Sequence, residues 1–275
     1  MRLASARFER LVLLNRPRKL SKTVRQNLDN ENINVKYQNN KVNQMRNNER
    51  VTYGLLITIV VFAIATIAGS KLNFNIDFLP NTFLTYTCML GLSIALIYSF
   101  KKQIDYKISL PKFRKLLKPI LFGFLATIIV NISMTILTKV LGGEIETPAL
   151  IMKMSPLQVF VFVFIYASIA EEILFRGFLL NFLKPLKTKG IIVLKRKISV
   201  PVIISAFAFG LAHLILITTG AGGLFLLRIV VFTTILGLIA GYYQEKYENN
   251  AFAIIVHMGG NFMGVIGVLL MNLNA

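Results

Sequence analysis

Apolar residues occur in long, nearly uninterrupted runs along most of this chain, and polar residues gather in the segments between the runs. An α-helix needs about 20 mainly apolar residues to cross the hydrocarbon of a bilayer. The pattern predicts seven such helices, each bounded by charged residues, Pro, Gly or Asn: about Val51 to Ser70, Leu84 to Phe100, Lys118 to Leu141, Pro156 to Leu183, Ile198 to Ile217, Leu224 to Tyr243 and Ala251 to Asn272. We therefore expect an all-α, polytopic membrane protein.

The first 50 residues break this pattern, because they are basic and hold few apolar side chains. Met1 to Leu14 can be interpreted as a short basic amphipathic helix that lies on the membrane, or as a frayed tail. Residues from about Gln26 to Asn48 are rich in Asn, Gln and Lys, a composition typical of disordered linkers. We expect a basic, partly disordered region here and no catalysis.

The net charge of +19 would fit a nucleic-acid partner, but the positions of the 31 Lys and Arg residues indicate a topology signal instead. Twelve of them precede the first predicted helix, seven lie between Lys101 and Lys118, and six lie between Lys184 and Lys197. These are alternate loops, so the positive-inside rule places the N-terminus in the cytoplasm and the C-terminus outside. We expect the lipid bilayer as a partner, and no nucleic acid. The abundance of Asn, Lys and Ile favours a bacterial cell membrane.

Two histidines and one acidic pair inside the apolar runs need an explanation. They are the only two histidines, His213 and His257, and the acidic pair Glu171 and Glu172. Each such group costs about 2.5 to 3.5 kcal/mol to insert into lipid, and the cost is usually tolerated for function. These residues are the candidate active site.

The spacing within the fourth run separates the two acids. On an α-helix Glu172 and Arg176 are four residues apart and share one face, where they can form a buried ion pair. Glu171 is rotated by about 100° and has no partner on its own helix. One interpretation is that all three residues form a structural network. We favour that role for Glu172 and Arg176, and the role of general base or acid for Glu171.

The seventh run repeats the spacing with His257 and Asn261, which project from one helix face. Nearby Gly259, Gly260 and Gly264 would let this helix approach others closely. A single membrane histidine is often only a hydrogen-bonding group between helices. The helical rise puts Glu171, His213, His257 and Asn261 within one layer between mid-membrane and the cytoplasmic side, so they can share one site.

Three spaced patterns on separate predicted helices together resemble a known family. They are Glu171-Glu172-x-x-x-Arg176, Phe209-x-x-x-His213 and His257-x-x-x-Asn261. In this order they are similar to the motifs of the CPBP or Abi family, which contains CAAX proteases and bacteriocin-processing enzymes. The resemblance extends over about Pro156 to Leu270.

The resemblance implies an intramembrane endopeptidase of the glutamate type. Glu171 and His213 would activate the attacking water, His257 and Asn261 would stabilise the oxyanion, and Glu172, Arg176 and Phe209 would support the site. The expected organisation is then a basic region over residues 1–50, N-terminal membrane helices over 51–150 and a catalytic membrane domain over 151–275. A bound metal is not favoured, but zinc held by Glu171, His213 and His257 stays open as an alternative.

Two other functions remain as alternatives. A catalytically silent membrane scaffold, such as a bacteriocin-immunity or regulatory protein, would use the same polar residues only for helix packing, together with Gly237-x-x-x-Gly241 and Gly260-x-x-x-Gly264. A proton-coupled transporter ranks last, because no inverted repeat is visible. For the protease, we expect the substrate to be a peptide leader, a pheromone precursor or a membrane-protein tail.

Overall fold

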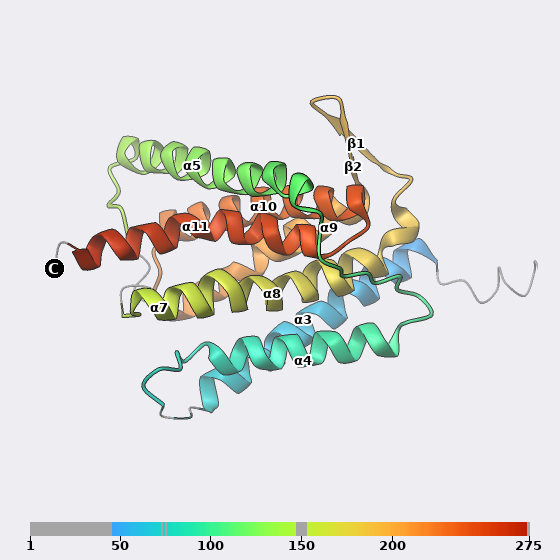
Figure 1. Ribbon diagram of the computed structural model, residues 1–275, viewed down its shortest axis with the longest axis horizontal. Helices are drawn as coiled ribbons and strands as arrows, with labels where there is room; N and C mark the ends of the chain where they lie inside the picture. The colour runs from blue at the N-terminus through green and yellow to red at the C-terminus, as the bar shows by residue number, and fades with distance from the viewer. Residues whose placement is uncertain (1–45, 73, 75, 147–152, 274–275) are drawn as a thin grey trace, which may run out of the picture. The chain divides into compact units, whose positions relative to one another are not determined.

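The computed structural model describes residues 46–72, 74, 76–146 and 153–273, and within them the chain folds almost entirely into helices (Figure 1). Six of these are long and apolar enough to cross a membrane: Asn47–Lys71, Phe113–Val140, Pro156–Leu180, Val200–Thr219, Gly223–Tyr247 and Ala251–Leu273. A seventh apolar helix, α4 (Phe83–Ser99), has 17 residues. The chain is a multi-pass membrane protein, and the predicted all-helical class is confirmed.

The N-terminal boundary differs slightly from the prediction. Helix α3 (Asn47–Lys71) begins four residues before the predicted start at Val51. Its Arg50 is buried, donates from Nη1 to the Phe182 carbonyl oxygen at 2.8 Å and lies 5.0 Å from the centre of the Phe182 ring. This anchored arginine explains the earlier start. The predicted helix over Met1 to Leu14 and the linker up to residue 45 lie outside the described residues.

The helices pack around the one that carries the acidic pair. This helix runs through α7 (Pro156–Gln158), η2 (Val159–Ala167), α8 (Ser168–Glu172) and η3 (Ile173–Leu180). Helices α3 and α4 pair with each other and lie on one side of it, as Figure 1 shows. On the other side lie α11 (Ala251–Leu273), α10 (Gly223–Tyr247) and α5 (Leu117–Val140). The acidic pair is thereby enclosed between the two groups of helices.

The fourth predicted helix is continuous but not uniformly α-helical. Both η2 and η3 are π-helical, and only the five residues of α8 between them keep α-helical hydrogen bonding. Large and β-branched side chains crowd an α-helical turn, and η2 consists of Val, Phe, Ile, Tyr and Ala only. A wider turn relieves that crowding, and π-helical turns are frequent at functional sites.

The fifth predicted helix ends in a tighter form. The α-helix α9 (Val200–Ala212) continues as the 3-10 helix η5 (His213–Thr219), and Gly220 closes it with a φ of 82°. Ser199 caps the start of α9 by accepting a hydrogen bond from the Val202 backbone N–H. His213 therefore stands at the junction between the two helical forms.

A β-hairpin that the hydrophobic pattern did not predict precedes α9. Strand β1 (Gly190–Val193) pairs antiparallel with β2 (Arg196–Ser199), and Val193 lies opposite Arg196. The hairpin occupies the basic loop between the fourth and fifth membrane helices. Its strands are short and lie among charged loop residues, so the pattern of long apolar runs does not indicate them.

Helices α5 and α11 approach each other closely at glycine positions. A Cβ atom on Gly123 would collide with the Val256 carbonyl oxygen, and one on Gly259 would come within 2.8 Å of the Ile120 carbonyl oxygen. The Thr127 hydroxyl uses this proximity to donate to the Gly260 carbonyl oxygen at 2.9 Å. The predicted close approach of the seventh helix is confirmed at Gly259 and Gly260. It is wrong for Gly264, which has open space beside it because it faces away from the neighbouring helices.

Candidate active site

The predicted pair of Glu172 and Arg176 forms as the spacing required. Arg176 donates from Nη1 to Oε1 of Glu172 at 2.9 Å, and both side chains are fully buried. The pair holds although Arg176 stands in the π-helical segment η3 and Glu172 in α8. A buried carboxylate and a buried guanidinium each need a counter-charge, and here each supplies it to the other.

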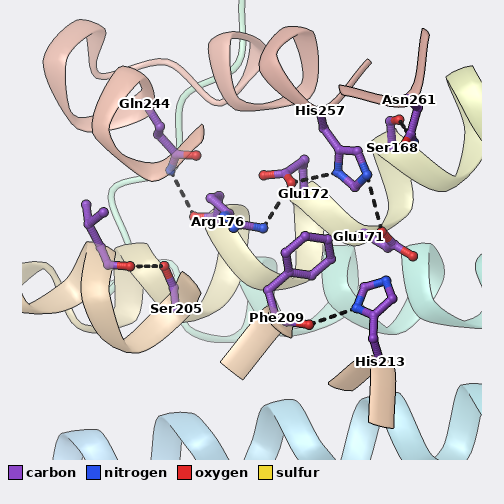
Figure 2. A network of polar contacts seen from close by, with 11 residues as sticks. Ser168, Glu171, Glu172, Arg176, Ser205, Phe209, His213, Gln244, His257 and Asn261 are labelled. Carbon is purple, nitrogen blue, oxygen red and sulfur yellow. Dashed lines mark hydrogen bonds and ion pairs between the residues drawn. The ribbon is translucent and has the colours of Figure 1, made fainter. Parts of the chain in front are cut away.

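The same carboxylate also holds a histidine from another helix. His257 in α11 donates from Nδ1 to Oε1 of Glu172 at 2.8 Å, because a carboxylate can only accept (Figure 2). This bond fixes the orientation of the imidazole ring, whose other nitrogen, Nε2, lies 3.6 Å from Oε2 of Glu171. Glu172 is therefore occupied by two donors, whereas Glu171 faces the free side of the imidazole.

Two features of the surrounding helices accommodate the Arg176 guanidinium. Its Cζ lies 4.6 Å from the centre of the Phe209 ring, a distance at which a cation is attracted to an aromatic face. A Cβ atom on Gly237 of α10 would collide with Nη2 of Arg176. Gly237 thus makes room for the cation, in addition to the helix contact that the sequence suggested for it. The Arg176 carbonyl oxygen accepts from Gln244 at 2.9 Å.

Glu171 is 8% exposed and receives a neighbour that the sequence did not indicate. The hydroxyl of Tyr86 in α4 lies near the Glu171 carboxylate and interacts with it electrostatically. The Tyr86 ring packs edge to face on Tyr166, with ring centres 6.4 Å apart, and the Tyr166 hydroxyl is 2.8 Å from the Thr87 hydroxyl. Helix α4 therefore contributes to the site, although the family resemblance begins about 70 residues later.

His213 is oriented by its own helix. Its Nδ1 donates to the Phe209 carbonyl oxygen at 3.0 Å, because a carbonyl oxygen can only accept. In the neutral ring this leaves Nε2 as a hydrogen-bond acceptor. The Phe209 ring contacts both imidazoles edge to face, with ring centres 5.0 Å from His213 and 5.4 Å from His257. The fully buried Phe209 thus separates and positions the two histidines.

Asn261 lies one turn beyond His257 on α11 and reaches the helix of the acidic pair. Its side-chain amide donates to the Ser168 hydroxyl at 3.1 Å and to the Val163 carbonyl oxygen at 3.3 Å. Ser168 is fully buried and stands one turn before Glu171 and Glu172. Ser168 could not be predicted from the sequence, because a serine in an apolar helix usually bonds to its own backbone and gives no signal of a distant partner.

The residues proposed as an alternative zinc set are only partly gathered. Glu171 and His257 are neighbours, and each histidine has its Nδ1 engaged in a hydrogen bond, which leaves Nε2 as the nitrogen that could bind a metal. In the described part of the chain, no three His, Cys, Asp or Glu side chains are grouped as metal ligands.

A known protein family matches the region of the chain that contains these residues. Residues 153–263 match the Rce1-like family, described as type II CAAX prenyl endopeptidase Rce1-like. The match includes every residue of the three motifs and supports, at family level, an intramembrane CAAX-type protease. It agrees with the resemblance to the CPBP or Abi family. No curated protein and no solved structure matches the chain.

Proposed function

We propose that this Rce1-like region hydrolyses a peptide bond of a membrane-associated peptide or protein, with Glu171 as the general base. The observation that carries the proposal is the unequal use of two adjacent carboxylates. Glu172 is occupied by Arg176 and His257, whereas Glu171 is left to face Nε2 of His257 and the hydroxyl of Tyr86. The carboxylate that is not bound by Arg176 is the one that can take a proton from water.

In the proposed reaction Glu171 and His213 activate the attacking water. The water oxygen forms a bond to the carbonyl carbon of the substrate while one of its protons passes to the Glu171 carboxylate. The acceptor nitrogen Nε2 of His213 holds the water through its second hydrogen. When the carbon–nitrogen bond breaks, Glu171 returns its proton to the leaving amine, so that the base is regenerated and no external acid is consumed.

The oxyanion needs donors that are held in place before the reaction begins. His257 donates from Nδ1 to Glu172, so only its imidazolium form has a second proton, on Nε2, and that proton would point to the same side as Glu171. Asn261 would contribute one amide hydrogen by exchanging its longer bond, at 3.3 Å to the Val163 carbonyl oxygen, for the substrate oxygen. Its bond to Ser168 would keep the amide in position during that exchange.

The proposed orientation follows from the positions of the basic loops. We place the N-terminus and the loops 101–118 and 184–197 in the cytoplasm of a bacterial cell, at what we call the basic end of the helices. Glu171 then lies within the membrane, reached by substrates that are anchored in the bilayer. The expected substrates are leader peptides, pheromone precursors and membrane-protein tails.

Proteolysis by the purified protein in detergent tests this function. The substrates are a quenched peptide library that includes prenylated and unprenylated CAAX peptides, because the matched family is described by a prenyl substrate. The proposal expects cleavage by the natural protein, and loss of cleavage in Glu171→Ala and His213→Ala at unchanged thermal stability. Cleavage that persists in Glu171→Ala would contradict the assignment of the base.

A chelator added to the same assay separates the two versions of the site. Unchanged cleavage is expected if Glu171 and His213 activate water without a metal. Loss of cleavage that zinc restores would instead assign Glu171, His213 and His257 to the role of ligands.

The alternative of a catalytically silent scaffold has one observation in its favour. His213 and Asn261 both donate to backbone carbonyl oxygens, which is how polar side chains commonly pack in membrane helices. The proteolysis assay discriminates between the two functions, because a scaffold would cleave none of the peptides. Variants of these residues in a scaffold would instead lose partner binding.

A further inference from the structure

The β1–β2 hairpin exposes apolar side chains outside the membrane-spanning helices. All four residues of β1 are exposed, and the side chains of Ile192 and Leu194 are 79% and 91% exposed. A soluble hairpin of this length usually places apolar side chains on one covered face and polar ones on the other. No face of β1 is covered, so burial within the described fold does not explain its composition.

The turn of the hairpin adds a conformational cost to this exposure. Leu194 and Lys195 form the two-residue turn, with φ angles of 48° and 63°. Turns with two such angles are normally made by Asn-Gly, because side chains with a full Cβ resist the left-handed region. A leucine at this position is therefore unfavourable both for the backbone and for exposure to water. Its presence indicates an environment in which an apolar tip is favoured.

The hairpin is fixed at the basic end of the helices by contacts near both of its ends. Next to the turn, the Arg196 guanidinium lies 5.5 Å from the centre of the Phe122 ring of α5 and 5.4 Å from that of Tyr242 in α10. At the open end, the Ser199 hydroxyl donates to the Glu245 carboxylate at 2.7 Å. The hairpin projects sideways from the helix axes, as Figure 1 shows. Its tip therefore lies beside the helix ends.

The charged residues within the hairpin and its flanking loop are all basic. Between the fourth and fifth membrane helices the chain has no acidic residue and six basic ones: Lys184, Lys187, Lys189, Lys195, Arg196 and Lys197. The segment that leads into α5 has the same character, with the exposed side chains of Leu110 and Phe113 among further lysines and an arginine. Apolar side chains beside basic ones are the composition that binds the surface of an anionic bilayer.

We propose that the β1–β2 hairpin is an interfacial anchor, whose apolar tip inserts into the leaflet at the basic end while its lysines bind anionic lipid headgroups. Insertion transfers Ile192 and Leu194 from water to the acyl-chain boundary. The anchor would fix the depth of α9 in the membrane, because α9 begins directly after β2. The depth of His213 would be fixed with it. The inference does not depend on proteolytic activity.

A single tryptophan at the tip tests insertion, because the natural sequence contains none. Leu194→Trp is reconstituted in lipid nanodiscs, and its emission and its quenching by lipids brominated near the headgroup end of the acyl chains are measured. Ile129→Trp, at an exposed position within α5, serves as the reference for a side chain inside the bilayer. The proposal expects blue-shifted emission and quenching by the shallow bromines. Emission typical of water would overturn it, and so would a blue shift without lipid quenching, which would indicate burial against a second copy of the chain.

The headgroup preference is tested in discs that contain equal amounts of phosphatidylglycerol and phosphatidylcholine, with bromine on one lipid at a time. Brominated phosphatidylglycerol should quench Leu194→Trp more strongly. Addition of Lys189→Gln and Lys195→Gln should reduce this preference, by roughly fivefold in local lipid ratio for each charge removed. Equal quenching by the two lipids in the protein with its lysines intact would overturn the electrostatic part of the proposal.

Discussion

His257 and Glu172 are joined by a 2.8 Å hydrogen bond that connects α11 to α8 inside the membrane helices. Arg176 donates to the same carboxylate oxygen from the other side. Two donors from different helices therefore meet at one atom of Glu172. The adjacent Glu171 is left with one oxygen 3.6 Å from the free nitrogen of His257. Removal of the Glu171 carboxylate should consequently affect a different property of the protein than removal of the Glu172 carboxylate.

Glu171→Gln should abolish proteolysis and leave the fold intact. Loss of a general base typically lowers kcat by about 10²- to 10⁴-fold. Glu172→Gln is the matched control, because it removes the negative charge that Arg176 and His257 share and should lower the thermal unfolding temperature in detergent. Parallel measurement of cleavage rate and unfolding temperature separates the two effects. Equal losses of stability in both variants would contradict the division of roles.

Arg176→Met should destabilise the protein, because it leaves the Glu172 carboxylate buried without its guanidinium partner. Breaking a buried ion pair in this way costs about 3–5 kcal/mol. Arg228→Met is a suitable control, since Arg228 donates to the Glu146 carbonyl oxygen near a helix end, away from the site. Denaturation of the two variants in detergent checks the difference. Similar stability of both would show that the Arg176 pair adds little.

Tyr86→Phe should lower kcat by roughly tenfold with little change in KM, because it removes a polar hydroxyl beside the base and almost no packing volume. Tyr166→Phe removes an equivalent hydroxyl that contacts Thr87 instead of Glu171. It should cleave peptides at nearly the natural rate. If both variants lose activity equally, the Tyr86 hydroxyl acts only through the packing of α4.

Gly123→Ala should separate α5 from α11, because the added methyl group would collide with the Val256 backbone. Overpacking of this kind typically costs about 1–3 kcal/mol. Gly264→Ala provides the same chemical change at a position with open space, and should leave stability unchanged. Thermal unfolding in detergent distinguishes them. Equal losses would contradict the assignment of the effect to contact between α5 and α11, because the change from glycine to alanine by itself favours an α-helix.

The sequence was informative wherever a physical rule acts within one helix. Long apolar runs predicted the membrane helices, and the four-residue spacing of Glu172 and Arg176 predicted their ion pair, which the structure confirms. The shift of Glu171 away from that pair was also visible in the spacing. These inferences need only the helical repeat and the penalty for a charge in lipid.

The partners across helices could not be predicted in the same way. Nothing in the pattern distinguishes Tyr86 from other tyrosines in apolar runs, so its contact with Glu171 appears only once α4 is packed against α8. The bond between Asn261 and Ser168 likewise depends on how α11 is rotated. The π-helical turns and the hairpin were missed because both depend on local crowding and turn geometry, which a search for hydrophobic periodicity does not measure.

The Glu172–Arg176 pair also bears on how the protein is made. Both residues lie on one helix and enter the bilayer together during synthesis, so neither charge has to cross the translocon without its partner. His257 is synthesised 85 residues after Glu172. It belongs to α11, whose backbone packs closely against Gly123 of α5. The constellation around Glu171 is therefore completed only when α11 inserts and docks. A chain that has emerged from the ribosome only as far as α10 would lack His257 and Asn261, and with them part of the candidate site.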